Sequence, residues 1–475
     1  MRSRLRMMLS GLWRPIDQEM QVKLTRRWNG LPVHLRTPQQ LLGRQELGCG
    51  ATVGVMPRCD FACTACYLGQ DDNRARPLVV EAVKRQLRVL RDYLGPGGNL
   101  QLTDGEVTLR PVGELVEILC EARRLHLVPM LMTHGEVIRR DPKLLERLVV
   151  EGGLRELCVH VDSLQRGRGE TYSSARTEES LNELRREFAE IIRSTCVSTG
   201  CTLRAASTVT VSRDNVSQVP SVVAWFLRNA DAFRLLSFQP IASVGRTRLG
   251  ESAGVDVEDL WTQIEAGINQ ATSRRTLADR WRRDCWHMGH DACSRILTGL
   301  VLGDAADTAC FQSLSPTCGA NAAVIADCIN RFGGIRLRHL GKLERLCRVL
   351  GMFARAPKLM GLQVPGVAWR IWRRLLEAYP ARPSTARVAW RCLRGETKIR
   401  RFTIVSHHFM SRAEIETPLG EARLQQCVFR VPLPDGKLMS MCEFNACRHR
   451  DRFYQGVSAA SVTDFTYRRA PPGSC

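Results

Sequence analysis

Three closely spaced cysteines constrain this chain more than any other feature of its sequence. Cys59, Cys63 and Cys66 are separated by three and then two residues, and they follow directly after the apolar run 51–56. Three thiolates at this spacing can bind three corners of a cubane and leave its fourth iron without a protein ligand. A structural zinc site requires four ligands, usually in paired C-x2-C spacing, and no second pair follows within the length of a zinc finger. The loop therefore predicts an iron–sulfur cluster with one open iron.

A second motif, LQLTDGEVTLRP, lies downstream at residues 100–111. Together the two motifs resemble those of the radical S-adenosylmethionine (SAM) enzymes, and the resemblance covers residues 48–245. In this family a strand ends in a Gly-Gly-Glu motif, and here Asp104 replaces the first glycine and Val107 the following proline. Many members carry an aromatic residue just before the third cysteine. This chain has Ala65 there, with Tyr67 just after the cysteine, so Tyr67 is the candidate cofactor-binding ring.

The resemblance implies a cofactor set and an activity. The cysteine loop would hold a [4Fe–4S] cluster whose open iron is chelated by the amino and carboxylate groups of SAM. One electron, from a reductant such as flavodoxin or ferredoxin, would cleave SAM, and the 5′-deoxyadenosyl radical would activate a C–H bond. The implied SAM-binding residues are Gly105 and Glu106 near the ammonium, Asp162 and Ser163 near the ribose or sulfonium, and Asn215 near the carboxylate or ribose.

Short apolar runs alternate with helical periodicity between residues 48 and 275, which is typical of parallel strands with crossover helices. Strands are expected at 51–56, 100–103, 127–133, 156–161, 203–211 and 234–240. Helices are expected at 78–94, 113–125, 143–151, 178–196, 217–229 and 255–275. Six units fit the partial (β/α)6 TIM-type barrel of the resembled family, whose chemistry lies at the carboxyl ends of the strands. Two further units, which a complete barrel would need, are not evident.

Cysteines return after the expected barrel. The expected division of the chain is a basic lead-in (1–47), the barrel (48–275), a cysteine-rich connector (276–330), a basic helical region (331–401) and a C-terminal region (402–475). One interpretation of these cysteines is one or two auxiliary iron–sulfur clusters, as in the SPASM/twitch branch of the resembled family. The alternative is that they are buried, weakly polar core residues. The candidate ligands are Cys285, Cys293, Cys310, Cys318, Cys328, Cys427, Cys442 and Cys447.

The chain carries a net charge of +21, which predicts affinity for an anionic partner. Residues 331–401 hold 18 Lys and Arg against 3 Asp and Glu. Within them, residues 367–379 form a basic amphipathic pattern with two tryptophans, typical of a helix in a lipid headgroup layer. Gripping RNA phosphates is the alternative. No apolar run is long enough to span a bilayer, and no signal peptide is evident. We expect a cytoplasmic protein, peripheral at the inner membrane surface.

Three functions compete at this point. The first is a radical SAM enzyme acting on a lipid or other hydrophobic substrate at a membrane surface. The order of features along the chain is similar to that of the tetraether-lipid synthases and pterin methyltransferases. The second is a radical SAM enzyme that modifies RNA or a ribosomally made peptide. The third is a non-catalytic iron–sulfur protein.

Overall fold

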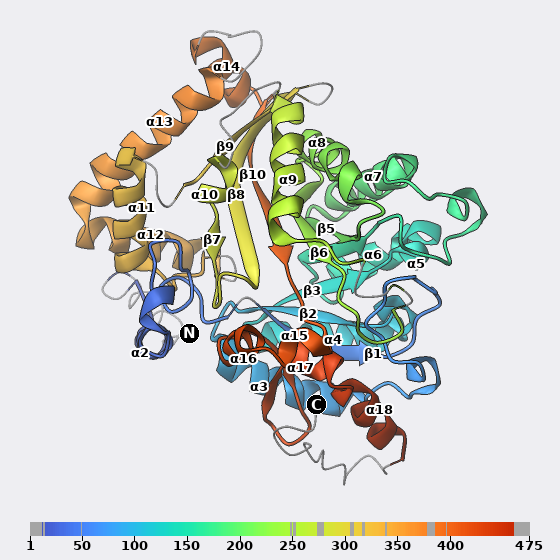
Figure 1. Ribbon diagram of the computed structural model, residues 1–475. Coiled ribbons are helices and arrows are strands. Elements are labelled where there is room, and N and C mark those ends of the chain that lie inside the picture. The colour runs from blue at the N-terminus through green and yellow to red at the C-terminus, as the bar shows by residue number, and fades with distance from the viewer. Residues whose placement is uncertain are drawn as a thin grey trace.

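The computed structural model describes residues 12, 15–48, 50–247, 249, 253–272, 280–304, 308–315, 319–337, 340–377, 385–395 and 397–459. These residues form one twelve-stranded sheet, in the order β12-β11-β1-β2-β3-β4-β5-β6-β10-β8-β7, with β9 also paired to β8 (Figure 1). The first six strands lie where the sequence predicts them, each within one residue at either end. They are β1 (Gly50–Met56), β2 (Asn99–Asp104), β3 (Val128–Thr133), β4 (Glu156–His160), β5 (Arg204–Val211) and β6 (Phe233–Pro240).

Strands β1 to β6 are parallel to their neighbours and form the predicted partial barrel. Crossover helices connect them because apolar residues recur at intervals of three and four, as Val83, Leu87 and Leu90 do, and all three are fully buried. Figure 1 shows these helices along one side of the strands. They are α3 (Val80–Leu94), α4 (Val112–Arg124), α5 (Glu136–Arg140), α6 (Pro142–Val150), α7 (Asn182–Thr199) and α8 (Val219–Arg228), followed by α9 (Val257–Thr272).

Two strands from the last part of the chain extend the parallel arc at both ends. β10 (Lys398–His407) is parallel to β6, and β11 (Phe429–Pro432) is parallel to β1. Eight consecutive strands therefore run parallel, from β11 through β1–β6 to β10. The sequence predicts only six, because pairing between strands so far apart in the chain leaves no periodic signal. β10 also crosses the boundary expected at residue 401, so the C-terminal region is part of the same sheet.

The region expected as a cysteine-rich connector contains strands of the sheet. β8 (Ser294–Asp304) runs antiparallel to β10 along the whole length of that strand. β7 (Trp286–His287) and β9 (Thr308–Ser313) both pair with β8. Two helices flank these strands, α10 (Arg280–Arg283) and α11 (Gly319–Phe332).

The basic region contributes α12 (Lys342–Arg355), a π-helical turn (Leu359–Gln363), α13 (Val364–Glu377) and α14 (Thr385–Leu393). The apolar face of α13, predicted to lie in a membrane, packs instead against the sheet. Ile371, Leu375 and Leu376 are buried in one cluster with Leu302 of β8 and Cys310 of β9. The amphipathic helix predicted here is therefore confirmed, but its apolar face belongs to the core of the protein.

The remaining elements frame the two ends of the arc. Helix α2 (Gln18–Asn29) precedes the barrel. After β10 come α15 (Arg412–Ile415) and α16 (Pro418–Gln425), then the β11–β12 hairpin with β12 at Leu438–Ser440. The chain continues into α17 (Met441–Ala446) and α18 (His449–Ala459), which Figure 1 shows next to β1.

Candidate active site

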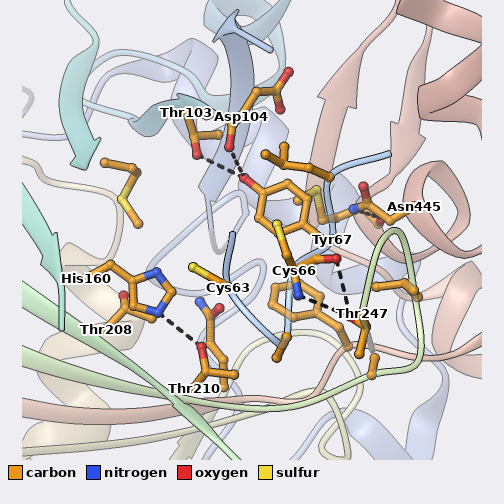
Figure 2. Close-up of a pocket in the computed structure, with 18 of the residues that line it drawn as sticks. Cys63, Cys66, Tyr67, Thr103, Asp104, His160, Thr208, Thr210, Thr247 and Asn445 are labelled. Carbon is orange, nitrogen blue, oxygen red and sulfur yellow. Dashed lines mark hydrogen bonds between the residues drawn. The ribbon is translucent and has the colours of Figure 1, made fainter. Parts of the chain in front are cut away.

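A cavity of about 200 Å³ lies at the carboxyl end of the parallel strands. All eight parallel strands contribute side chains to its wall. In parallel α/β barrels, ligands bind at this carboxyl end of the strands. The loop with the first three cysteines closes one side, and α17 closes another (Figure 2). Residues from the strands include Thr52, Thr103, Thr133, His160, Thr208, Gln239, His407 and Phe429.

Cys59, Cys63 and Cys66 all line this cavity. Figure 2 shows Cys66 beside the ring of Tyr67, and the backbone N–H of Cys66 donates to Thr247 Oγ1 at 3.1 Å. Burial raises the pKa of Cys59 and of Cys63, that of Cys63 to about 12. Burial lowers the pKa of the Arg246 guanidinium, but the charges of Cys66, Cys59 and Cys63 outweigh this effect and raise it overall. One guanidinium therefore lies within electrostatic range of all three thiols.

Glu106 and Gly105 form the turn after β2. The Glu106 carboxylate is 1% exposed and accepts hydrogen bonds from Thr108 N–H (3.0 Å), Thr108 O–H (2.6 Å), Thr133 O–H (2.6 Å) and His134 N–H (2.8 Å). A Cβ at Gly105 would lie 2.0 Å from the carbonyl oxygen of Arg58, so only glycine fits between this turn and the cysteine loop. The turn is thereby fixed at the rim of the cavity.

His134, at the end of β3, joins this turn to the cysteine loop. Its Nε2 lies 2.8 Å from Asp60 Oδ1, and its ring stacks on Phe61 with centroids 3.7 Å apart. The sequence predicts that a strand ends just before His134, but it does not predict these contacts, because Asp60 and Phe61 reach His134 only when the cysteine loop is folded.

Tyr67 lines the cavity and is held from behind by the C-terminal helix. Its hydroxyl donates to the carbonyl oxygen of Asp104 at 2.7 Å, and the guanidinium of Arg450 lies 5.0 Å from its ring centre. Arg450 pairs with Asp104 at 2.9 Å and with Asp72 at 2.7 Å. Sequence reasoning missed Arg450, since nothing in its surroundings marks it as a partner of a motif more than 300 residues earlier.

Asp162, Ser163 and Asn215 do not line the cavity. The Asp162 carboxylate accepts from the backbone N–H groups of Leu164 and Thr210, at 2.9 and 3.1 Å. The amide of Asn215 donates to Ser163 Oγ, Glu178 Oε1 and Thr210 O. These three residues form a buried polar network that joins the ends of β4 and β5.

The polar wall that the sequence did not single out consists of residues within the strands. His160 Nε2 lies 3.0 Å from Thr210 Oγ1 and 2.8 Å from Asp162 Oδ2. Alternation along the strands could have identified His160, Thr208 and Thr210, because residues two apart in a strand share a face.

The later candidate cysteines fall into two groups. Cys442 lines the cavity, and burial together with the charges of Cys427 and Cys293 raises the pKa of its thiol. Cys447 is buried in the same apolar cluster as Cys442 and is disulfide-bonded, so the expectation that it binds a metal is wrong. Cys285, Cys310 and Cys328 instead pack in three separate apolar clusters. Cys318 lies outside the described residues.

The first three cysteines fit an iron–sulfur cluster better than a single ion. Two sulfurs bound to one zinc ion lie at most about 4.6 Å apart, because each Zn–S bond is about 2.3 Å. Among the described residues, the trio with all its ligand atoms within 4.8 Å is Cys59, Asp60 and His134, not the three cysteines. Cys59, Cys63 and Cys66 are spread more widely, yet all face one cavity, as the ligands of a cubane would.

Residues 53–201 match the family model described as the radical SAM superfamily. A curated relative is 7,8-dihydro-6-hydroxymethylpterin dimethyltransferase of Methanocaldococcus jannaschii, 23% identical over 197 residues that cover 41% of this chain and 37% of the relative. The chain thus spans little more than a third of the length of that relative.

Two solved structures are also similar to this chain. Native anSMEcpe with bound AdoMet is 13% identical with a TM-score of 0.34, and the match covers 47% of this chain and 60% of that one. The FeFe-hydrogenase maturase HydG from Carboxydothermus hydrogenoformans is 11% identical with a TM-score of 0.33, and the match covers 72% of this chain and 81% of that one.

Proposed function

We propose that this chain, whose residues 53–201 match the radical SAM family model, is a radical SAM enzyme that activates a C–H bond of a lipid or other hydrophobic substrate at a membrane surface. The observation that carries this proposal is the meeting of three thiols, Glu106 and Tyr67 in one cavity at the carboxyl ends of eight parallel strands.

Cys59, Cys63 and Cys66 would hold the [4Fe–4S] cluster, and Glu106 and Tyr67 would contact SAM. When bound, these cofactors supply one-electron cleavage of a sulfonium C–S bond and a carbon radical that removes hydrogen from a C–H bond. The protein holds Tyr67 and Glu106 in place through Asp104, Thr108 and Thr133, and burial excludes water from the carboxylate. A reductant such as flavodoxin or ferredoxin is the expected electron donor.

The part of the cavity wall supplied by the C-terminal region favours a hydrophobic substrate. Phe409, Met410, Phe429 and Met441 line it there, in contrast to the threonines and His160 of the barrel strands. An apolar wall opposite the polar residues suits a molecule with an alkyl or aromatic portion, because such surface is more favourable away from water.

A second feature favours the membrane surface. Helix α12 exposes Leu343, Leu346, Leu350 and Phe353, and their spacing of three, four and three places them on one face. Trp369 of α13 and Trp390 of α14 are also exposed, by 57% and 61%. These apolar side chains lie within residues 331–401, which hold 18 basic and 3 acidic residues. Exposed apolar side chains among basic residues are typical of a surface that binds an anionic lipid headgroup layer. No described helix is long and apolar enough to cross a bilayer.

The catalytic part of the proposal is tested by anaerobic reconstitution with iron and sulfide, followed by dithionite and SAM. We expect 5′-deoxyadenosine to form, to be lost in Cys63→Ala, and to persist in Cys120→Ala, whose residue is exposed on α4 and does not line the cavity. A well-formed cluster that never cleaves SAM would contradict an enzymatic role and favour the non-catalytic iron–sulfur protein.

The membrane part is tested separately by sedimentation with vesicles. We expect binding to vesicles that contain anionic lipid, weaker binding at high salt, and loss of binding in Leu346→Gln/Leu350→Gln. Val197→Gln, at a still more exposed apolar side chain of α7, is the control and should bind as the unaltered protein does. Salt-sensitive retention on RNA, with none on vesicles, would overturn this part and favour an RNA substrate.

A further inference from the structure

Three rings from the C-terminal region meet in the wall of the cavity. They belong to His407 at the end of β10, Phe409 two residues later and Phe429 at the start of β11, and each is half-buried. The ring centroids of His407 lie 6.3 Å from those of Phe409 and 6.1 Å from those of Phe429. The two phenylalanine rings are 5.9 Å apart in an edge-to-face arrangement. These separations are those of attractive aromatic pairs, and we call the three residues the aromatic trio.

The aromatic trio joins the two ends of the parallel arc. β10 and β11 are the outermost of its eight strands, and among the described strands they form no backbone pair with each other. The contact between His407 and Phe429 therefore connects these ends through side chains. A ligand that lies against the rings has no backbone hydrogen bond between β10 and β11 to break.

His407 presents an imidazole to the cavity. Successive residues of a strand face opposite sides of the sheet. Ser406 faces the helices, since its Oγ accepts from Trp261 Nε1 of α9 at 2.9 Å, and His407 lines the cavity. No hydrogen bond joins either ring nitrogen of His407 to another group within the described part of the chain. Burial lowers the pKa of His407 to about 4, so near pH 7 the neutral ring offers one donor and one acceptor.

This neutral imidazole discriminates between hydrophobic ligands. An alkyl chain packed against His407 would cover its nitrogens without giving them a hydrogen bond, which is unfavourable for a buried polar group. A planar ring that contains nitrogen or oxygen can bond to the imidazole and also pack edge-to-face or offset-stacked on Phe409 and Phe429. The neighbouring side chains of Met410 and Met441 also line the cavity, and thioethers make favourable contacts with aromatic rings.

We propose that the aromatic trio is a substrate subsite for a planar heteroaromatic ring, with the imidazole of His407 hydrogen-bonded to a nitrogen or oxygen atom of that ring. The inference deepens the proposed function and rests on it, because it assigns the ring-bearing part of the hydrophobic substrate to the C-terminal wall. The cysteine loop, Glu106 and Tyr67 form other parts of the same cavity. Binding of the ring does not require cleavage of SAM, so it can be measured by itself.

The test measures the affinity of small probes by isothermal titration calorimetry. It uses the full chain, reconstituted anaerobically with iron and sulfide, without a reductant and with saturating SAM. SAM keeps the probes from the open iron and from the nucleoside site. The probes are benzimidazole, with two ring nitrogens, indene, with the same fused-ring shape but none, and 1-hexanol. We expect benzimidazole to bind about fivefold more tightly than indene, because one net hydrogen bond contributes that much, and 1-hexanol to bind more weakly than benzimidazole.

Variants assign the binding to the aromatic trio. His407→Phe keeps a ring and removes both nitrogens, so it should abolish the preference for benzimidazole while indene still binds. Phe429→Leu should weaken the binding of both ring probes. Phe444→Leu is the matched control, since Phe444 is buried against Phe453 and does not line the cavity. It should leave both affinities unchanged, and circular dichroism checks the fold of each variant.

The proposal is wrong if none of the probes binds, if indene binds as tightly as benzimidazole, or if 1-hexanol binds most tightly, which would assign an alkyl chain to this wall. Benzimidazole that binds without SAM but is displaced by it would also overturn the proposal, because the rings would then hold the nucleoside of the cofactor. So would a preference for benzimidazole that survives in His407→Phe. Because the readout is the affinity of a probe, these failures are distinguishable from a failure to form 5′-deoxyadenosine, which would contradict the proposed function.

Discussion

The guanidinium of Arg450 lies 2.9 Å from the carboxylate of Asp104, and this contact ties the last described helix to the turn after β2. Asp104 has a backbone φ of 96°, a left-handed conformation that an L-residue other than glycine seldom adopts. Burial lowers the pKa of Arg450, but Asp104 and Asp72 outweigh burial and raise it overall. The tyrosine hydroxyl of Tyr454 also donates to Asp104. The C-terminal helix thus compensates a strained residue beside the candidate SAM site.

Replacement of Arg450 by methionine is predicted to destabilise the protein strongly. It would leave the carboxylates of Asp72 and Asp104, whose side chains are 3% and 8% exposed, without a counter-charge. Removal of one partner of a buried ion pair costs about 3–5 kcal/mol. The measurement is the free energy of unfolding in urea.

Arg452→Met is the control for this variant, because Arg452 is exposed on the same helix and should change stability by less than about 0.5 kcal/mol. Adding Asp104→Gly to Arg450→Met should recover part of the loss, since glycine tolerates the left-handed backbone and carries no charge. Equal stability of Arg450→Met and Arg452→Met would show that the ion pair contributes nothing.

The barrel could be predicted from the sequence because its signals are local. Runs of apolar residues mark each strand from β1 to β6, and intervals of three and four mark the helices between them. The turn of the β11–β12 hairpin, at Asp435–Gly436, also has a local sequence signal, because Gly436 adopts the positive φ, 81°, that the turn requires. Cys59, Cys63, Cys66 and Glu106 could be proposed because they belong to compact motifs.

What the sequence could not reveal depends on contacts between distant segments. β10 and β11 join the parallel arc through pairing with β6 and β1, and Arg450 reaches Asp104 in the same way. The candidate ligands Asp162, Ser163 and Asn215 follow the ends of strands, and their hydrogen bonds are directed at other buried groups. A polar residue at a strand end can satisfy the backbone of its own turn or face a ligand, and only the fold separates the two.

Gly105→Ala is predicted to disrupt the turn after β2. The added Cβ would meet the backbone carbonyl of Arg58 at 2.0 Å, and a backbone atom cannot move aside as a flexible side chain can. Overpacking of this kind costs about 1–3 kcal/mol, and the displaced Glu106 should abolish 5′-deoxyadenosine formation. Unfolding in urea and product analysis measure the two effects.

The matched control is Gly113→Ala in helix α4, where an added Cβ meets nothing within 4 Å. Alanine should stabilise that helix by up to about 1 kcal/mol and leave product formation unchanged. Full activity of Gly105→Ala would mean that the turn can move without consequence.

Glu106→Gln is predicted to lower both the free energy of unfolding and the rate of SAM cleavage. The carboxylate accepts four hydrogen bonds with its two oxygens, and an amide would turn an NH2 group toward at least one N–H or O–H donor. A buried donor left without an acceptor costs about 1–3 kcal/mol. Glu183→Gln, at an exposed glutamate of α7, serves for comparison and should be neutral in both assays. A fully stable but inactive Glu106→Gln would assign the carboxylate to the cofactor alone.

Variants in α12 and α13 should separate packing within the protein from docking on the membrane. Leu375 of α13 is fully buried against the sheet, so Leu375→Ala should cost about 2–5 kcal/mol of unfolding free energy. Leu350 of α12 is 49% exposed, so Leu350→Ala should change stability by less than about 0.5 kcal/mol. With vesicles the order should reverse, because Leu350→Ala removes exposed apolar surface and Leu375→Ala does not. Should both variants bind vesicles as the unaltered protein does while only Leu375→Ala is unstable, the exposed face of α12 would have no part in membrane docking.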